Sequence, residues 1–187
     1  MPWSIAELNS RWGALPPSPH DRGCVVQVAV RPDLDQRAFP ASLELSPLRG
    51  AIGDRWERRT WMYLPDGRPD PRVQVAVMNA STLKFMQLVT GCTRHPGDTV
   101  LVDLDLSVEN LPAGARVRVG TAVLEISDVE NNACAKFAAA YGDDILQWIR
   151  APENRARRHR GLFASIVQGG TVSTGDCVER VEARHRG

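Results

Sequence analysis

The sequence has no two cysteines close enough together to form a paired metal or redox motif. Its four cysteines are far apart and none belongs to a C-x-x-C pair: Cys24, Cys92, Cys134 and Cys177. Zinc ribbons, iron–sulfur loops and dithiol redox motifs use such pairs, so the spacing disfavours these sites. We expect free thiols in a reducing compartment.

Long apolar runs are also missing. No stretch approaches the roughly 18 apolar residues of a membrane-spanning helix, and no signal-peptide pattern is present. Lysine is scarce, because only Lys84 and Lys136 stand among the 23 basic residues, which leaves little choice for a Schiff base. We expect a cytoplasmic protein with no membrane partner.

An excess of one charge is absent too, since the formal net charge of the 187 residues is +1. This balance, with 43% hydrophobic and 24% charged residues, is typical of a globular protein rather than a disordered or bulk nucleic-acid-binding chain. The length suits one domain. We expect an N-terminal helix and linker over residues 1–23 and a single domain over residues 24–187.

Alternating apolar residues dominate the chain. Residues 24–32 and 73–79 are predicted strands, and residues 97–129 alternate repeatedly with glycine turns, as antiparallel strands do. Helical patterns gather at residues 80–91 and 134–158. The fold class is therefore β-rich α+β, and we expect an antiparallel β-barrel with a few short helices packed on one side.

Two connecting segments carry further expectations. The loop over residues 50–72 contains Trp56, Trp61 and Tyr63, and aromatic residues in a long loop indicate that it folds over a site or a groove. The Gly169–Gly170 pair is typical of a hairpin turn, because no helix follows it.

Residues 131–161 combine a cysteine with a basic run. The pattern predicts a short helix with Asn131 or Asn132 as its cap and Cys134 in its first turn, where the helix dipole and Lys136 favour a thiolate. Such a thiolate attacks electrophiles, carries sulfur or binds a soft metal. The alternative is that Cys134 is small core filler.

An arginine-rich run closes this segment. Five arginines and His159 follow with a single acid between them, and this run is either an anion site or a solvated helix face. We expect Arg150, Arg158 and Arg160 to meet the anionic part of a small ligand.

Five motifs resemble the stand-alone MOSC domain family, named after the C-terminal domain of molybdenum cofactor sulfurase. They are GDRW at 53–56, VAVMN at 75–79, VDLDLSVENLP at 102–112, ACAKF at 133–137 and RGLFASIVQGGTVSTGD at 160–176. The resemblance covers about residues 25–181. It implies a barrel-like fold and a cysteine, Cys134, that carries sulfur as a persulfide or ligates molybdenum in molybdopterin.

The resemblance and the chemistry of the side chains together define the expected site. Cys134 is the sulfur carrier or metal ligand, and Lys136 keeps it ionised. Further cofactor-binding candidates come from the family motifs, with turn-stabilising roles as their alternative: Asp54, Arg55, Asn79 and Asn110. No pyridoxal phosphate site of its own is expected, and a cysteine desulfurase or a molybdoenzyme is the implied partner.

One departure from the family precedes the cysteine. Stand-alone members carry His-Thr-Gly there, whereas this chain has Asn131, Asn132 and Ala133. His159 is then the candidate for proton transfer by its chemistry.

Three functions follow as alternatives. The first is a molybdenum-cofactor-binding or sulfur-carrier protein, which would make the chain a sulfurtransferase or a component of a molybdenum-dependent reductase. The second is a binding module that holds molybdopterin or another anionic small molecule without chemistry. The third is a small-barrel nucleic-acid binder, which the neutral net charge disfavours.

Overall fold

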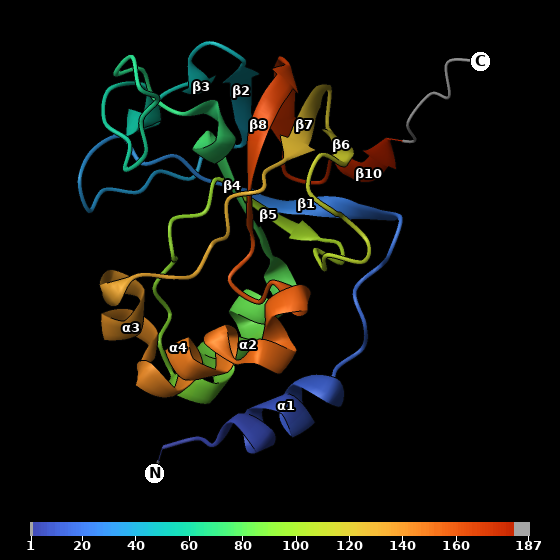
Figure 1. Ribbon diagram of the computed structural model, residues 1–187. Helices are drawn as coiled ribbons and strands as arrows, with labels where there is room; N and C mark the ends of the chain where they lie inside the picture. Colours follow the sequence, from blue (N-terminus) through green and yellow to red (C-terminus); the bar gives the residue numbers. More distant parts are fainter. Residues whose placement is uncertain (1, 182–187) are drawn as a thin grey trace.

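The computed structural model describes residues 2–181 and has a closed β-barrel at its centre (Figure 1). In the described chain the barrel has seven strands, in the order β1-β10-β6-β7-β8-β4-β5. Their bounds are β1 Arg22–Val28, β4 Val75–Asn79, β5 Val100–Asp103, β6 Arg116–Val119, β7 Ala122–Ile126, β8 Leu162–Gln168 and β10 Cys177–Val181. The expected β-rich barrel is confirmed.

One pair of neighbouring strands departs from the antiparallel pattern. β4 and β5 are parallel, whereas the other neighbours around the barrel are antiparallel, so the barrel is mixed. Parallel neighbours need a crossover connection, and helix α2 (Ala80–Thr90) provides it between β4 and β5. The alternation of residues 97–129 predicts antiparallel strands and does not indicate this parallel crossover.

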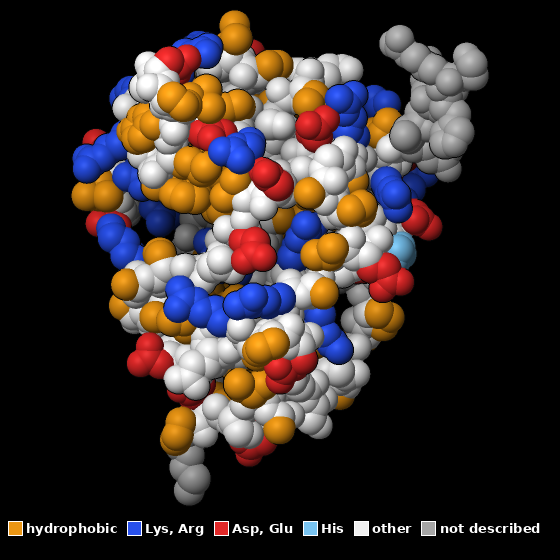
Figure 2. All heavy atoms as spheres, viewed as in Figure 1, with side chains coloured by type: hydrophobic (Ala, Val, Ile, Leu, Met, Phe, Trp, Pro, Cys, Tyr) orange, Lys and Arg blue, Asp and Glu red, His pale blue; other side chains and the backbone are white. Residues whose placement is uncertain are grey.

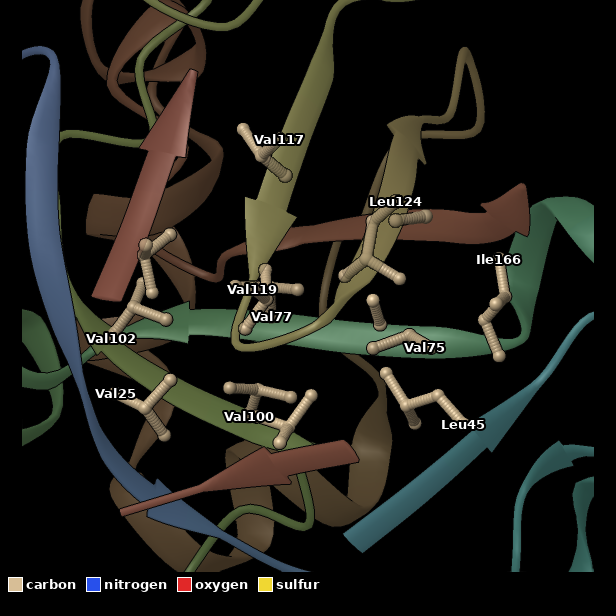
Figure 3. Close-up of a cluster of buried hydrophobic side chains, with 14 of the residues drawn as sticks. Val25, Leu45, Val75, Val77, Val100, Val102, Val117, Val119, Leu124 and Ile166 are labelled. Atoms are coloured by element: carbon tan, nitrogen blue, oxygen red, sulfur yellow. The ribbon is translucent and has the colours of Figure 1, made fainter. Parts of the chain in front are cut away.

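The barrel interior is filled by aliphatic side chains that point toward one another (Figure 3). Strand β4 is buried along its whole length, because successive side chains face opposite sides of a sheet and both sides are covered. Val75 and Val77 face the barrel core, while Met78 faces the helices.

A small second sheet lies beside the barrel and consists of β2 (Ser42–Ser46), β3 (Gly50–Ala51) and β9 (Gly170–Ser173). The Gly169–Gly170 pair does not form the predicted hairpin, because β9 leaves β8 and pairs with β2 instead. Gly170 passes so close to Thr121 that an added Cβ would lie 2.6 Å from its carbonyl carbon. Close backbone approach therefore explains this glycine.

The α-helices of residues 2–181 gather on one side of the barrel in Figure 1, as the sequence predicts. They are α1 Ile5–Gly13, α2, α3 Ala135–Tyr141 and α4 Asp143–Arg150, and short 3₁₀ turns lie at η1 Arg55–Glu57, η2 Pro71–Val73 and η3 Pro152–Arg157. Trp12 of α1 packs edge-on against Phe85 and Trp148. None of the helices within residues 2–181 combines the length and apolar character that crossing a membrane requires.

Helix α3 begins two or three residues later than the sequence predicts. Cys134 is the N-cap itself, in place of Asn131 or Asn132, and its side chain makes no capping hydrogen bond. The reason lies in the preceding residue, because Ala133 has a left-handed φ of 58° and turns the chain into the helix at that point.

Candidate functional site

Cys134 lies on the wall of a cavity of about 640 Å³ between the barrel and helix α3. Lys and Arg side chains gather around a hollow at the left of Figure 2, between the loops above and the helices below. Residues from several loops, from helix α3 and from strands β4 and β8 line the cavity: Arg31, Asp35, Arg37, Arg55, Trp61, Ala76, Arg94, His95, Pro96, Gly97, Glu130, Asn131, Asn132, Ala133, Cys134, Lys136, Phe137, Ala140, Tyr141, Arg160 and Phe163.

The segment before α3 is held in place from both sides. Arg150 donates from Nε to the Asn132 carbonyl at 2.9 Å and from Nη2 to the Ala133 carbonyl at 3.3 Å. Asn131 donates from Nδ2 to the Arg160 carbonyl at 3.3 Å. These hydrogen bonds hold the backbone of residues 131–133 in place, directly before the exposed Cys134.

Three cations of the cavity are paired with acids. Arg31 donates from Nε to Asp54 at 2.9 Å, and Arg160 donates from Nη1 to Asp98 at 2.7 Å. Both aspartate side chains are almost fully buried behind the wall. Lys136, at the exposed rim, lies 3.2 Å from Asp35. The buried carboxylates orient their arginines and neutralise them.

Three further arginines of the wall have no such partner. Arg37, Arg55 and Arg94 form no salt bridge with an acid of the described chain. Burial, followed by repulsion from Arg31, Arg94 and Arg55, lowers the pKa of the Arg37 guanidinium. The cavity therefore has an excess of positive charge that an anion would offset.

Buried nitrogens without partners lie in the same wall. Within the described residues they include Nε of Arg37, Nε of Arg160 and Nε2 of His95. His95 accepts the Gly97 N–H on Nδ1 at 3.0 Å, so its proton is on Nε2. Burial is the main cause that lowers the pKa of His95, which favours a neutral imidazole. Such unsatisfied donors are costly unless a ligand or water meets them.

Aromatic rings complete the cavity. Trp61 remains 63% exposed and lies 5.8 Å from the Phe163 ring, centroid to centroid. Phe137 stacks on Tyr141, and the Cζ atom of the Arg160 guanidinium lies 5.1 Å from the centroid of the Phe137 ring. The Tyr141 hydroxyl donates to the Arg94 carbonyl, which ties the Arg94 loop to α3. A flat ligand would find stacking surfaces beside the cations.

Several residues of the expected site lie elsewhere, in structural contacts. Asn79 caps α2, accepting the Thr82 N–H and donating to Ser18 and the Leu104 carbonyl. Asn110 is fully buried and donates to the backbone carbonyls of His20 and Asp105. Neither side chain lines the cavity. Asp54 also stays behind the wall, where it holds Arg31.

The arginine-rich run of residues 150–160 does not form one basic face. Arg158 donates inward to the carbonyls of Leu106 and Leu111, and burial lowers its pKa. His159 is 2% exposed and stacks on Trp148 with centroids 4.0 Å apart, among the helices. Only Arg160 of this run reaches the cavity, while Arg150 braces the Cys134 segment.

The sequence interpretation missed several cavity residues. Arg31, Arg37, Arg94 and His95 come from two loops whose composition is unremarkable, and only tertiary packing brings them to Cys134. Trp61 had a signal, because aromatic residues in a long loop indicate a covered site. No sequence signal indicated Asp98, because it is one of several acids in a segment that is predicted to form alternating strands.

Comparisons with known proteins agree with this fold. Residues 97–179 match the family model of the MOSC domain. The YuaD protein of Bacillus subtilis has a similar structure, with TM-score 0.60 and 20% identity over 87% of this chain and 97% of that one. YiiM of Escherichia coli gives TM-score 0.58 and 18% identity, over 87% and 70% of the two chains.

At these identities the solved structures support the fold alone. No curated protein matches the chain in sequence. The family match includes Cys134, Arg160 and the Asp98 that pairs with it. Residues 97–179 thus match the MOSC family that the sequence motifs indicate, and this match confirms the resemblance.

Proposed function

We propose that the cavity binds a flat, anionic small molecule of the molybdopterin type and that Cys134 acts there as a sulfur carrier or metal-binding thiol. The observation that carries this proposal is the shared wall. Cys134 and five arginines line one cavity, together with buried nitrogens that have no partner in the described chain.

The residues present fit the parts of such a cofactor. Arg37, Arg55 and Arg94 would hold its phosphate, because guanidinium groups bind phosphate through charge-assisted hydrogen bonds. Trp61 and Phe163 would stack on its flat pterin. A volume of about 640 Å³ is in the usual range for small-molecule sites. When bound, the cofactor supplies a metal that a thiolate can ligate.

As a sulfur carrier, Cys134 would take sulfur from a donor persulfide. The Cys134 thiolate attacks the outer sulfur of the donor, a new S–S bond forms on Cys134, and the donor thiolate leaves. Atoms and electrons balance without an added oxidant. The exposed sulfur at the start of α3 is accessible for this attack, and the cations that line the same cavity would stabilise an anionic persulfide.

Sulfur loading tests this role. A cysteine desulfurase and free cysteine are supplied, and the full chain is then measured by intact mass and peptide mapping. We expect the gain of one sulfur atom on Cys134 and none in Cys134→Ser, whereas Cys92→Ser still loads. Loading on another cysteine in the native chain would reject the assignment.

Binding without chemistry is the second candidate, and a specific observation favours it. Cys134 Sγ makes no hydrogen bond with a described residue, and His159 lies among the helices rather than at the cavity. Metal and pterin analysis of protein from a molybdenum-replete host separates the two. Bound cofactor without persulfide formation would support the binding module.

A further inference from the structure

A pair of thiols lies on the outside of the barrel, away from Cys134. Cys24 on β1 and Cys177 on β10 are direct partners across the antiparallel ladder. Cys24 is exposed and Cys177 is half-buried, while their neighbours Val25 and Val178 point into the core. Because side chains alternate along a strand, both cysteines project from the same outer face.

The ladder geometry brings these side chains close. The Arg180 N–H bonds to the Asp21 carbonyl and the Val25 N–H to the Asp176 carbonyl, so hydrogen-bonded pairs flank the cysteine pair at alternate positions. Cys24 and Cys177 therefore form a non-hydrogen-bonded pair. The Cα atoms of such a pair are about 4.5 Å apart, which lies within the range of disulfides.

A cation stands beside one of the two sulfurs. Arg22 donates from Nε to Cys177 Sγ at 3.1 Å, closer than the Glu179 carboxylate at 4.0 Å. Reactive cysteines are found beside arginine in partly exposed positions, and Cys177 has both features. Cys177 is thus suited to attack first and Cys24 to resolve.

We infer that Cys24 and Cys177 are a redox modification site, at which a small-molecule disulfide such as oxidised glutathione forms a cross-strand disulfide. The Cys177 thiolate attacks oxidised glutathione, an S–S bond forms, and one glutathione thiolate leaves. Cys24 then attacks the Cys177 sulfur and releases the second glutathione. Two protein thiols are oxidised, and one glutathione disulfide is reduced to two thiols.

The cross-link would join the two strands at a seam that closes the barrel, since β10 connects β1 to β6. It bridges residues far apart in the sequence, and such links restrict the unfolded chain strongly. Oxidation should therefore raise the melting temperature, and a reductant should reverse the rise. The cavity with Cys134 is formed by other segments and does not contain either thiol.

Peptide mapping tests the site in the full chain. After treatment with oxidised glutathione and trapping of free thiols with iodoacetamide, trypsin should yield residues 23–37 linked to residues 161–180. We expect Cys24→Ser and Cys177→Ser to keep one glutathione on the remaining cysteine, while Cys92→Ser still forms the link.

Other outcomes would overturn the inference. They are stable glutathione adducts on both cysteines of the native chain, a link through Cys92 or Cys134, or no modification of either cysteine. A matched melting experiment is the second readout, because a disulfide that forms should raise the melting temperature in the native chain and not in Cys24→Ser.

Discussion

Arg160 binds both carboxylate oxygens of Asp98 through a single nitrogen, Nη1, at 2.7 and 2.9 Å. The rest of its guanidinium is left to the cavity, and its Nε is buried without a partner. Asp98 itself is 1% exposed. A buried acid thus holds a cation in the position where a ligand anion would meet it.

Asp98→Ala should destabilise the protein strongly. Removing one partner of a buried ion pair leaves an uncompensated charge, so we expect the free energy of unfolding to fall by about 3 kcal/mol. Urea unfolding followed by tryptophan fluorescence measures this loss. The control is Asp66→Ala, because the Asp66–Arg68 pair is exposed to solvent and should contribute little to stability. Equal losses in both variants would contradict the structural role of Asp98.

Ala133→Gly should not weaken the protein. A left-handed φ costs a non-glycine residue such as Ala133 about 1 kcal/mol, and glycine avoids this cost. The greater entropy of glycine in the unfolded chain cancels part of this gain. We expect unchanged or slightly higher stability. In contrast, Ala139→Gly inside α3 should lower the free energy of unfolding by about 1 kcal/mol. A similar loss in Ala133→Gly would show that the backbone before Cys134 is not left-handed.

The stability of the protein should fall as the pH decreases below the ordinary pKa of histidine. Burial, with a smaller effect from Arg157, lowers the pKa of His159 from 6.5 to about 3. The unfolded chain binds the proton first, so the neutral buried imidazole stabilises the fold above pH 6.5 and that contribution is lost between 6.5 and 3. The slope should approach about 1.4 kcal/mol per pH unit.

His159→Phe separates this histidine from other titrating groups. The variant keeps a ring to stack on Trp148 but cannot take up a proton, so its stability should fall less steeply between pH 7 and pH 5 than that of the native chain. Parallel slopes for the native chain and His159→Phe would show that His159 is not protonated on unfolding.

Arg37→Gln should weaken anion binding. Pyrophosphate added to the native chain is expected to raise the melting temperature, because it offsets charges in the cavity. Loss of one charge-assisted hydrogen bond costs about 1.5 to 3 kcal/mol, which corresponds to about tenfold or more in affinity. Arg118→Gln, on strand β6, is the matched control and should bind as the native chain does. Equal affinities would mean that the anion binds elsewhere.

Local patterns in the sequence predicted the elements well. The helix predicted within residues 1–23 is α1, the alternation of residues 73–79 corresponds to β4, and the helical pattern of residues 80–91 corresponds to α2, so local patterns are sufficient there. The parallel pairing of β4 with β5 was not predictable in this way, because it depends on where α2 returns the chain. Gly170 likewise meets Thr121 only in the folded barrel.

The candidate site was predictable only in part. The sequence indicated Cys134, Lys136, Arg55 and Arg160 as neighbours of a ligand, and all four line the cavity. Charge density along the chain was a poor guide to the other arginines. Arg158 turns inward to backbone carbonyls, whereas isolated arginines such as Arg37 face the cavity, and only the tertiary fold decides this.

Whether an anion in the cavity shields Cys134 is the most direct test of the proposed site. Alkylation of the full chain by iodoacetamide, followed at Cys134 and Cys24 by peptide mapping, is compared with and without pyrophosphate. We predict that pyrophosphate slows the reaction at Cys134 and leaves Cys24 unchanged, and that Arg37→Gln reduces this protection. Equal rates at Cys134 with and without saturating pyrophosphate would contradict a shared cavity for the thiol and the arginines.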